Sequence, residues 1–386
     1  MKKFFFLSLL CLFQLAIFPA AQAQTLPPPT IAAKSWLLLD TTSNQIIASE
    51  NPGTRIEPAS LTKIMTAYLV FEALRDKKLS MDQTVNVSVK AWKVDSDSSK
   101  MFIEPKTPVT VNDLLYGLIV QSGNDAAVAL AEAVAGTEEA FAVLMNREVE
   151  RMGLKETHFA NSHGLPNPQN YSTANDLARI AQNLIVDFPD YYKTFYSTKS
   201  FTYNKITQPN RNRLLWLDPT VDGMKTGHTD AAGYCLISSA KRPNGSGERR
   251  LISVVLGATS DQVRAQESLK LLNWGFMNFD TVKLYEKNQA ISPPVEIWKG
   301  TQATIKIGFT KDLYVTLPKG SAARIKPQLE RKDPLVAPIA ANTQIGTMKM
   351  IVDGKSVAEF PVMALETVDQ ASIFGRAWDS IRLWLK

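Results

Sequence analysis

The sequence predicts an α+β fold in which an antiparallel sheet is interrupted by a helical block and followed by a small all-β domain. Strand-like alternation opens and closes the larger, first part of the chain, whereas apolar residues between these strands recur at helical spacing. After about residue 279 the helical spacing is lost and short alternating runs take its place. A helical pattern returns only at the end of the chain.

Composition limits the classes of protein to consider. The chain has 386 residues, 45% of them hydrophobic and 21% charged, which excludes a disordered chain, a collagen-like repeat and a disulfide scaffold. At roughly 100–200 residues per domain, this length predicts two domains. The net charge of +6 is too small and too evenly spread to indicate a nucleic-acid-binding protein. A single strongly apolar stretch, at the start, excludes a polytopic membrane protein.

Residues 1–23 have the pattern of a secretory signal peptide. Two lysines follow the first methionine, an apolar run continues to residue 18, and Ala21 and Ala23 supply the small residues of a cleavage site. The apolar run is shorter than the ~20 residues that a membrane-spanning helix needs. We therefore expect an exported protein whose mature chain keeps one cysteine, Cys235, in an apolar strand-like run.

The first domain is predicted to cover residues 24–278. A proline-rich tether leads into a β-hairpin whose strands lie at residues 35–40 and 45–49. Helical spacing then predicts helices at residues 60–74, 111–120, 126–135, 140–152 and 174–185. Strands are predicted to return near residue 221, at 233–239 and at 250–258, followed by a helix at 262–274.

The second domain is predicted to be all-β and to cover residues 279–367. Alternation marks residues 303–307 and 313–317, and an Asp353-Gly354 turn joins two strands into a hairpin. It contains no candidate catalytic group, so we expect a spacer or an interaction module.

The end of the chain, residues 368–386, is predicted to form an amphipathic helix. On a helical projection the apolar side chains form one continuous arc, made of Ile373, Trp384, Ala377, Ile381, Phe374, Leu385 and Trp378. The other side holds three cations and one anion, namely Arg376, Arg382, Lys386 and Asp379, and Leu383 alone is misplaced among them. This pattern predicts attachment to the surface of a membrane with anionic lipids. The alternative is a terminal helix whose apolar face packs on the protein's own core.

The first strong helix opens with a serine and a lysine three positions apart. Ser60 and Lys63 therefore share one face of the helix, one turn apart. A hydroxyl beside an amine can act as nucleophile and base when burial and nearby positive charge suppress ionisation of the amine. The helix N-terminus adds N–H groups for a developing oxyanion. Alone, the pattern is more often an N-cap serine beside a solvated lysine.

Two further motifs follow in the settings that a serine peptidase of this type needs. Ser122-Gly123-Asn124 lies in a loop between helices, and Lys225-Thr226-Gly227 lies ahead of a strand. Together with Ser60 and Lys63 they form the S-x-x-K, S-x-N, K-T-G set of penicillin-recognising serine enzymes. Over nearly the whole mature chain, the sequence resembles low-molecular-mass penicillin-binding proteins of the D-alanyl-D-alanine carboxypeptidase type. The matching segments include residues 58–67, 121–125, 210–216 and 221–228.

This resemblance implies a β-lactamase/transpeptidase-like fold and an activity. The enzyme would remove the terminal D-alanine from peptidoglycan stem pentapeptides, would need no cofactor or metal, and would be inhibited by β-lactams such as penicillin. It would act at the periplasmic face of the bacterial inner membrane, held there by the terminal helix.

The resemblance also implies the role of each motif residue. Ser60 would form the acyl-enzyme, Lys63 would be the general base, and Ser122 would relay a proton to the leaving D-alanine. Substrate binding would fall to Asn124, Lys225, Thr226, Gly227, His228, Arg211 and Arg264. In that set Asn124 would hold the substrate amide, and Lys225 with Thr226 would bind the terminal carboxylate. The backbone N–H groups of Ser60 and His228 would form the oxyanion hole, and the two arginines would support the carboxylate site.

Physical reasoning agrees with the role of Lys225. A substrate that ends in a free carboxylate needs a cation, and Lys225 is placed at a sheet edge where an extended peptide can lie. Because Lys63 is expected to face the same cleft, we also expect the charge of Lys225 to help keep Lys63 neutral.

Several alternatives stay open. A class A β-lactamase would share the acylation chemistry, but its E-x-x-L-N segment is absent between Asn124 and Lys225. A non-catalytic wall-binding module and an endopeptidase that cuts cross-links are further possibilities. The three histidines, His158, His163 and His228, are poor candidates for a serine–histidine hydrolase or a metal site, because they lack motif partners.

Overall fold

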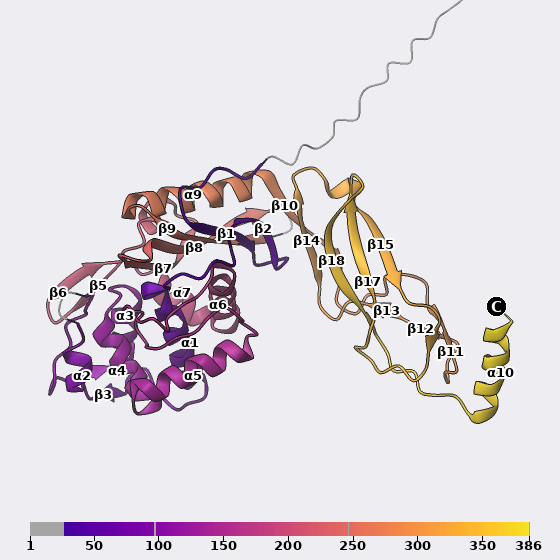
Figure 1. The fold of residues 1–386 in the computed structure, drawn as a ribbon, viewed down its shortest axis with the longest axis horizontal. Coiled ribbons are helices and arrows are strands. Elements are labelled where there is room, and N and C mark those ends of the chain that lie inside the picture. The colour runs from indigo at the N-terminus through magenta and orange to yellow at the C-terminus, as the bar shows by residue number, and fades with distance from the viewer. Residues whose placement is uncertain (1–26, 96–97, 246, 386) are drawn as a thin grey trace, which may run out of the picture.

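The computed structural model describes residues 27–95, 98–245 and 247–385, so the signal-peptide segment predicted at residues 1–23 lies outside the described part. The elements from β1 (Ser35–Asp40) to α9 (Asp261–Asn278) form a mixed body, and β10 (Phe279–Tyr285) to β18 (Lys355–Ala364) form an all-β body beside it (Figure 1). The last helix, α10 (Ile373–Trp384), lies at the far end of the all-β body. The predicted α+β class with an all-β domain and a terminal helix is confirmed.

The main sheet is antiparallel and has five strands in the order β2-β1-β9-β8-β7. Its remaining members are β2 (Gln45–Glu50), β7 (Val221–Thr229), β8 (Gly233–Asn244) and β9 (Gly247–Ala258). Strand β1 pairs with β9, so the first and last strands of this domain are neighbours although the helical block separates them in sequence. The predicted insertion of helices into an antiparallel sheet is therefore confirmed. Strand β7, which carries the K-T-G motif, is an edge strand.

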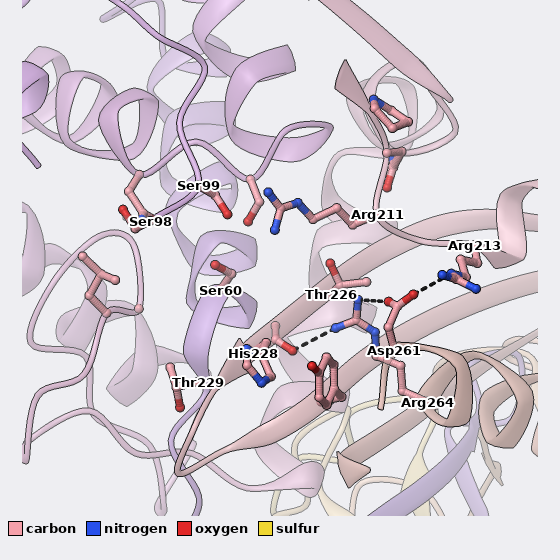
Figure 2. A pocket seen from close by; sticks show the side chains of 18 of the residues that line it. Ser60, Ser98, Ser99, Arg211, Arg213, Thr226, His228, Thr229, Asp261 and Arg264 are labelled. Carbon is pink, nitrogen blue, oxygen red and sulfur yellow. Dashed lines mark hydrogen bonds and ion pairs between the residues drawn. The ribbon is translucent and has the colours of Figure 1, made fainter. Parts of the chain in front are cut away.

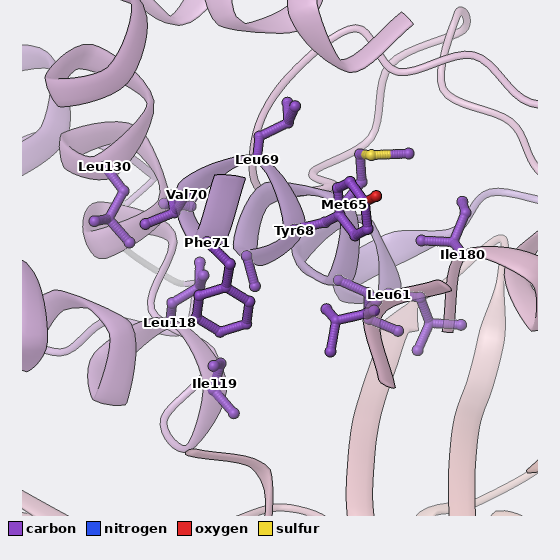
Figure 3. Packing of buried hydrophobic residues seen from close by; sticks show 14 of the residues in the cluster. Leu61, Met65, Tyr68, Leu69, Val70, Phe71, Leu118, Ile119, Leu130 and Ile180 are labelled. Atoms are coloured by element: carbon purple, nitrogen blue, oxygen red, sulfur yellow. The ribbon is translucent and has the colours of Figure 1, made fainter. Parts of the chain in front are cut away.

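Helix α1 (Lys63–Arg75) forms the centre of the helical block. Every residue from Lys63 to Phe71 is buried, as is typical of a helix that is surrounded by protein on all sides. Figure 3 shows Val70 and Phe71 facing Leu118 and Leu130 of neighbouring helices. This packing fixes the start of α1, and with it the S-x-x-K motif.

The other helices of this domain surround α1 or cover the sheet. They are η1 (Ala59–Thr62), α2 (Val89–Trp92), α3 (Val111–Ile119), α4 (Asn124–Ala135), α5 (Glu138–Arg151), α6 (Ala174–Asp187), α7 (Pro189–Tyr196) and α8 (Leu214–Leu217). Helix α9 covers the sheet face opposite to the helical block (Figure 1). Side-chain oxygens at the N-caps of α3, α5, α6 and α9 accept backbone N–H groups, which explains why those helices begin where they do. Two small hairpins complete the domain, β3 (Thr84–Val85) with β4 (Val109–Thr110) and β5 (Ser200–Tyr203) with β6 (Ile206–Pro209).

The all-β domain contains three small sheets around its own apolar core. Strand β10 pairs with β14 (Leu313–Pro318), and β11 (Val295–Trp298) lies between β12 (Thr304–Ile305) and β16 (Leu335–Val336). The third sheet has the order β13-β18-β17-β15, with β13 (Ile307–Gly308), β15 (Lys326–Arg331) and β17 (Gln344–Val352). The predicted hairpin around Asp353-Gly354 joins β17 and β18.

Helix α10 has the predicted apolar face, and this face is exposed. Phe374 is 88% exposed and Trp384 is 85% exposed, so the alternative in which the apolar face packs on the protein's own core is wrong. Within residues 27–95, 98–245 and 247–385, no helix combines the length and apolar character needed to cross a membrane.

Candidate active site

The three motifs meet in one cleft of about 660 Å³ between the helical block and the edge strand β7 (Figure 2). Ser60 lies in η1, Ser122 follows α3, Asn124 begins α4, and Thr226 lies in β7. The cleft is lined by eight of the ten residues predicted for the site, namely Ser60, Ser122, Asn124, Arg211, Thr226, Gly227, His228 and Arg264. The other two, Lys63 and Lys225, are buried beside the cleft. Lys63 bonds to Ser60, and Lys225 bonds to Ser122.

The nucleophile candidate lies on a tight turn. Ala59, directly before Ser60, has φ of 48°, a left-handed conformation that is costly for a residue with a Cβ atom. Strand β7 packs directly against this turn, since a Cβ at Gly227 would lie 3.2 Å from both the Ala59 Cβ and the Pro58 carbonyl oxygen. The turn therefore places the Ser60 hydroxyl between α1 and the strand that would bind an extended substrate.

Lys63 contacts three oxygens from three separate segments. Its Nζ lies 2.9 Å from Ser60 Oγ, 2.6 Å from Asn124 Oδ1 and 2.7 Å from the His163 carbonyl oxygen. A neutral amine has two hydrogens and one lone pair. The Asn124 and His163 oxygens can accept the two hydrogens, which leaves the lone pair directed at the Ser60 hydroxyl.

Burial is the main reason why Lys63 can be neutral. Desolvation, followed by the charge of Arg211, lowers the pKa of Lys63 to about 7, against a smaller opposing effect of Asp125. Arg211 is the cation that adds to burial here, and the expected repulsion between Lys63 and Lys225 lowers the pKa of Lys225. Figure 2 shows Arg211 extending across the cleft toward Ser99 and Ser60.

Lys225 makes the matching contact with the second serine. Its Nζ lies 2.9 Å from Ser122 Oγ and 3.0 Å from the Thr226 carbonyl oxygen. Burial, followed by the charges of Lys63, Arg211 and Arg264, holds the pKa of Lys225 well below its usual range. A site in which cations lower one another's pKa attracts an anion, because a bound carboxylate relieves their repulsion.

The two remaining predicted residues on β7 and α9 have different surroundings. His228 is exposed, and its ring lies 4.1 Å from that of Tyr234. The buried Arg264 donates to the Gly227 carbonyl oxygen at 3.1 Å and also pairs with Asp261, which in turn pairs with Arg213. Arg264 thus supports the edge strand from α9, whereas Arg211 reaches into the cleft.

Sequence reasoning missed a buried cluster that supports Lys63. The Glu138 carboxylate accepts the Ser162 backbone N–H at 3.1 Å and the Ser162 hydroxyl at 2.7 Å, and its Oε1 lies 3.3 Å from His163 Nε2. His163 Nδ1 accepts the Leu165 backbone N–H at 3.0 Å, so its proton is on Nε2 and faces Glu138. The atom of this loop that contacts Lys63 is the His163 carbonyl oxygen. Because it is a backbone atom, no side-chain motif in the sequence indicates its role.

The ionisation of this cluster follows from its surroundings. Burial, together with the charges of Lys63 and Lys90, lowers the pKa of His163 to about 4 against the opposing charge of Glu138. Burial opposes ionisation of Glu138, but His163, Ser162 and Lys90 outweigh it and lower the pKa of this carboxyl. At neutral pH the pair is therefore a neutral imidazole bonded to a carboxylate.

Asp125 is a second residue whose role sequence reasoning did not assign. It is buried, and its two oxygens accept the backbone N–H groups of Met101, Phe102 and Ile103 at 2.9, 2.8 and 3.2 Å. These bonds hold the segment that follows Ser98 and Ser99, two further residues that line the cleft. The signal for Asp125 in the sequence was its position directly after Asn124 of the S-x-N motif.

The alternatives based on histidine find no support in the contacts. In the described part of the chain, the Ser60 hydroxyl has its hydrogen-bond contact with Lys63, and His158 stacks on Tyr171. Among the same residues, no group of three or more His, Cys, Asp or Glu side chains is placed to hold a metal ion. Cys235 is buried as expected, and burial raises the pKa of its thiol to about 11.

Comparisons with known proteins identify the family of the chain. Residues 21–260 match the D-alanyl-D-alanine carboxypeptidase family, and residues 279–370 match the penicillin-binding protein 5 C-terminal domain. The chain is 42% identical over 369 residues to the D-alanyl-D-alanine carboxypeptidase DacC of Escherichia coli, covering 94% of this chain and 91% of that protein. It is 44% identical over 363 residues to DacA of Haemophilus influenzae, covering 93% and 91%.

Solved structures show the same relationship. Penicillin-binding protein 5 of H. influenzae superposes with a TM-score of 0.84 at 43% identity, covering 89% of this chain and all of that one. Penicillin-binding protein 6B of E. coli superposes with a TM-score of 0.71 at 39% identity, covering 88% of this chain and 97% of that one. The chain therefore belongs to the D-alanyl-D-alanine carboxypeptidase family of penicillin-binding serine peptidases.

Proposed function

We propose that the protein removes the C-terminal D-alanine from peptidoglycan stem pentapeptides through an acyl-enzyme on Ser60. The observation that carries this proposal is the contact of 2.9 Å between Lys63 Nζ and Ser60 Oγ, made by a buried lysine whose pKa is about 7. This arrangement provides a base that is available at neutral pH, which a solvated lysine is not.

The proposed acylation step starts from the contact between Lys63 and Ser60 and uses the roles that membership of the family implies for the other residues. Lys63 takes the proton of the Ser60 hydroxyl as Oγ bonds to the carbonyl carbon of the penultimate D-alanine. The backbone N–H groups of Ser60 and His228 stabilise the oxyanion. The bond from that carbon to the leaving nitrogen then breaks, and the proton passes from Lys63 through the Ser122 hydroxyl to the departing D-alanine. Water next adds to the same carbon, and one of its protons passes to Ser60 Oγ as the Oγ–carbon bond breaks. This step frees Ser60 and the shortened peptide.

Substrate binding uses the cationic side of the cleft. Lys225 and Thr226 bind the terminal carboxylate with help from Arg211, while Asn124 holds the substrate amide. In support, the charges of Lys63, Arg211 and Arg264 contribute to lowering the pKa of Lys225 in the unliganded cleft. A bound carboxylate would reverse this effect and would be attracted for the same reason.

The proposal includes the chain's organisation and its location. Residues 1–23 would direct export and be removed, residues 24–278 would form the peptidase domain, and residues 279–367 would form the all-β spacer. Residues 368–386 would attach the enzyme to the periplasmic face of the bacterial inner membrane. The exposed apolar side of α10, with Trp378 at 64% exposure and Trp384 at 85%, supports attachment to a lipid surface.

The test is to incubate the purified protein with a pentapeptide that ends in D-Ala-D-Ala and to measure released D-alanine. The wild type should release one D-alanine per peptide, and Ser60→Ala should release none while keeping the wild-type melting temperature. The same samples are given benzylpenicillin, which should leave a long-lived adduct on the wild type. Rapid repeated hydrolysis of penicillin would instead indicate a β-lactamase, and penicillin binding without D-alanine release would indicate a wall-binding module.

A further inference from the structure

The side of α10 opposite its apolar face contacts the all-β domain. We propose that this contact locks the helix to the protein, so that the enzyme stands on the membrane in one fixed orientation rather than on a loose tether. The proposal rests on the membrane attachment proposed above and adds the residues that hold the helix. These residues are Asp379, Arg382 and Leu383, which we call the docking stripe.

Each member of the docking stripe has a partner near strand β11. Asp379 Oδ2 accepts the backbone N–H of Lys299 at 2.6 Å. The Arg382 guanidinium lies over the Trp298 ring at 5.3 Å and 3.8 Å from the Asp379 carboxylate. Leu383 lines a cavity of about 460 Å³ together with residues of the all-β domain that include Trp298. The stripe therefore combines a charge-assisted hydrogen bond and a cation–π contact with an apolar side chain that faces the all-β domain across this cavity.

The spacing of the stripe explains the one residue that the amphipathic pattern did not fit. Asp379, Arg382 and Leu383 are three and four positions apart, so they share one face of the helix. Leu383 is half-buried on this face, whereas Ile381 and Leu385 on the apolar face are exposed. The misplaced leucine thus faces the all-β domain rather than open solvent.

The segment that leads into α10 is also paired with the all-β domain. The Thr301 backbone N–H donates to the Asp369 carbonyl oxygen at 2.9 Å, and the Ala371 N–H donates to the Lys299 carbonyl oxygen at 2.8 Å. These bonds hold the segment before α10, up to two residues before the helix begins, and the docking stripe holds the second half of the helix. A helix on a loose tether would have neither set of contacts.

A buried polar cluster fixes the other end of the all-β domain to the peptidase domain. Asp40 Oδ2 lies 2.6 Å from Arg249 Nε and accepts hydrogen bonds from the hydroxyls of Thr281 and Thr316. Asp40 and Arg249 are almost completely buried, and Arg249 Nη1 also donates to the Phe279 carbonyl oxygen at 2.6 Å. Asp40 and Arg249 both belong to the peptidase domain, so the contacts that cross to the all-β domain are the two threonine hydroxyls and the Phe279 carbonyl oxygen. Moving one domain relative to the other would take these partners from two buried charged groups.

Together these contacts make a continuous connection from the membrane-binding face to the active site. Figure 1 shows α10 crossing the far end of the long axis of the molecule, with the peptidase domain at the opposite end. The apolar side of α10, which includes Phe374 and Trp378, faces away from the all-β domain. A lipid surface that binds this side would therefore hold the active-site cleft at one height and in one orientation.

The lock is tested first in solution, without lipid, by hydrogen–deuterium exchange on the full mature chain. In the wild type the backbone amides of α10 should be protected, because a helix of this length is marginal when undocked. The double variant Asp379→Ala, Arg382→Ala should exchange about tenfold faster in α10 and at wild-type rates in the peptidase domain. Ser380→Ala, which changes an exposed polar side chain of the same helix outside the docking stripe, is the control. Equal exchange rates in the double variant and the wild type would show that the docking stripe does not hold α10 on the all-β domain, and the proposal would be wrong.

The orientation is tested on vesicles of phosphatidylethanolamine and phosphatidylglycerol. A fluorescent penicillin on Ser60 serves as donor, and a labelled lipid serves as acceptor for energy transfer. The wild type and Ser380→Ala should give one narrow distance distribution, and the double variant should stay bound but give a broad one. A distribution that is equally broad, or equally narrow, in all three proteins would contradict the fixed orientation.

A further variant separates this proposal from membrane attachment itself. Phe374→Ser, Trp378→Ser removes apolar surface but keeps the docking stripe. If this variant binds vesicles as tightly as the wild type, the attachment proposal fails, and the exchange experiment still decides whether the helix is docked. Loss of vesicle binding with unchanged exchange in α10 would support both proposals.

Discussion

At the scale of single residues, the behaviour of Lys63 decides the chemistry, because the same amine must hold Ser60 and accept its proton. Its three contacts use a side-chain amide oxygen, a backbone carbonyl oxygen and the nucleophile itself. Burial and Arg211 supply the energy that disfavours the charged form. A general base works best when its pKa lies near the working pH, and this one does.

The lowered pKa of Lys63 predicts how acylation depends on pH. Below about pH 7 Lys63 is protonated and cannot act as base, so kcat/KM should fall about tenfold per pH unit as pH decreases. Above pH 7 the amine is neutral, and the rate should level off. Lys63→Arg should be inactive at every pH, because arginine stays charged in proteins. Stopped-flow measurement of penicillin acylation checks both, and a rate that is constant from pH 5 to pH 8 would contradict the role of Lys63.

Glu138 is predicted to be a positioning residue that acts through the His163 carbonyl oxygen. Glu138→Ala removes the acceptor for Ser162 and His163, leaves these buried groups unpaired, and should lower the free energy of unfolding by about 1–3 kcal/mol. It should also lower kcat more than it raises KM, because the contact with Lys63 is disturbed and the carboxylate site is not.

The neighbouring Glu139→Ala is the matched control for this prediction. Glu139 lies in the same first turn of α5, but its side chain is 76% exposed and pairs with Lys90 at the surface. We expect its kinetics and melting temperature to match those of the wild type. An unchanged kcat and an unchanged pH profile in Glu138→Ala would show that Glu138 has no part in positioning the base.

Sequence reasoning identified the motif residues because their side chains do the chemistry and recur at fixed spacings. It missed Glu138 and His163 for a physical reason, since one acts from a neighbouring helix and the other acts through a backbone atom. It predicted the repulsion between Lys63 and Lys225 but not that the charge of Arg211 also lowers the pKa of Lys63. The distance between cations in a folded cleft cannot be read from their order along the chain.

At the scale of elements, the site depends on how closely the loop that contains His163 and Gly164 approaches the turn at Ala59, directly before Ser60. Gly164 in this loop has φ of 86°, and a Cβ at this position would lie 1.8 Å from the Ala59 carbonyl oxygen. Only a glycine permits this approach. The same loop supplies the His163 carbonyl oxygen to Lys63, so its position affects both members of the Ser60–Lys63 pair.

Two glycine-to-alanine changes separate the effect of the close approach from that of backbone strain. Gly164→Ala should destabilise the fold and lower acylation at least tenfold, because the Ala59 backbone must move. Gly153→Ala has a similar φ of 69° but open space around the added Cβ, so it should cost only about 1 kcal/mol of stability and leave acylation unchanged. Thermal unfolding and penicillin acylation measure both effects, and equal acylation rates in the two variants would contradict the account.

The long elements of the peptidase domain were predicted well, because a strong apolar period marks α3, α4, α5 and α6. The elements that sequence reasoning missed are short or lack such a period. Helix α7 begins at Pro189 and has aromatic residues on several sides, and the hairpin of β5 and β6 has few buried residues. Tertiary packing, rather than a local pattern, decides these segments.

At the scale of the whole molecule, Thr281 and Thr316 of the all-β domain donate hydrogen bonds to Asp40, a buried residue of the peptidase domain that pairs with Arg249. Asp40→Ala would leave Arg249 without its carboxylate and should lower the free energy of unfolding by about 3–5 kcal/mol. Thr281→Val, which removes one hydroxyl contact but keeps the ion pair, should cost less. Chemical denaturation of both variants gives the comparison, and a neutral Asp40→Ala would show that this buried cluster does not stabilise the molecule.

The amphipathic helix shows how far sequence alone could go at this scale. Its position and its apolar arc were predicted, because both follow from helical periodicity. The docking contacts were not, since Asp379 and Arg382 look like solvated charges until Lys299 and Trp298 are placed beside them. The partners lie about 80 residues away in sequence, where periodicity carries no information.

The most direct test of the central claim is to trap the covalent intermediate on its residue. The protein is mixed with a D-Ala-D-Ala pentapeptide, quenched in acid within one turnover, digested and analysed by mass spectrometry. Our account predicts an adduct with the mass of the pentapeptide acyl group minus one D-alanine, located on Ser60 and absent from Lys63→Arg. An adduct on another residue, or D-alanine release that continues in Ser60→Ala, would contradict it.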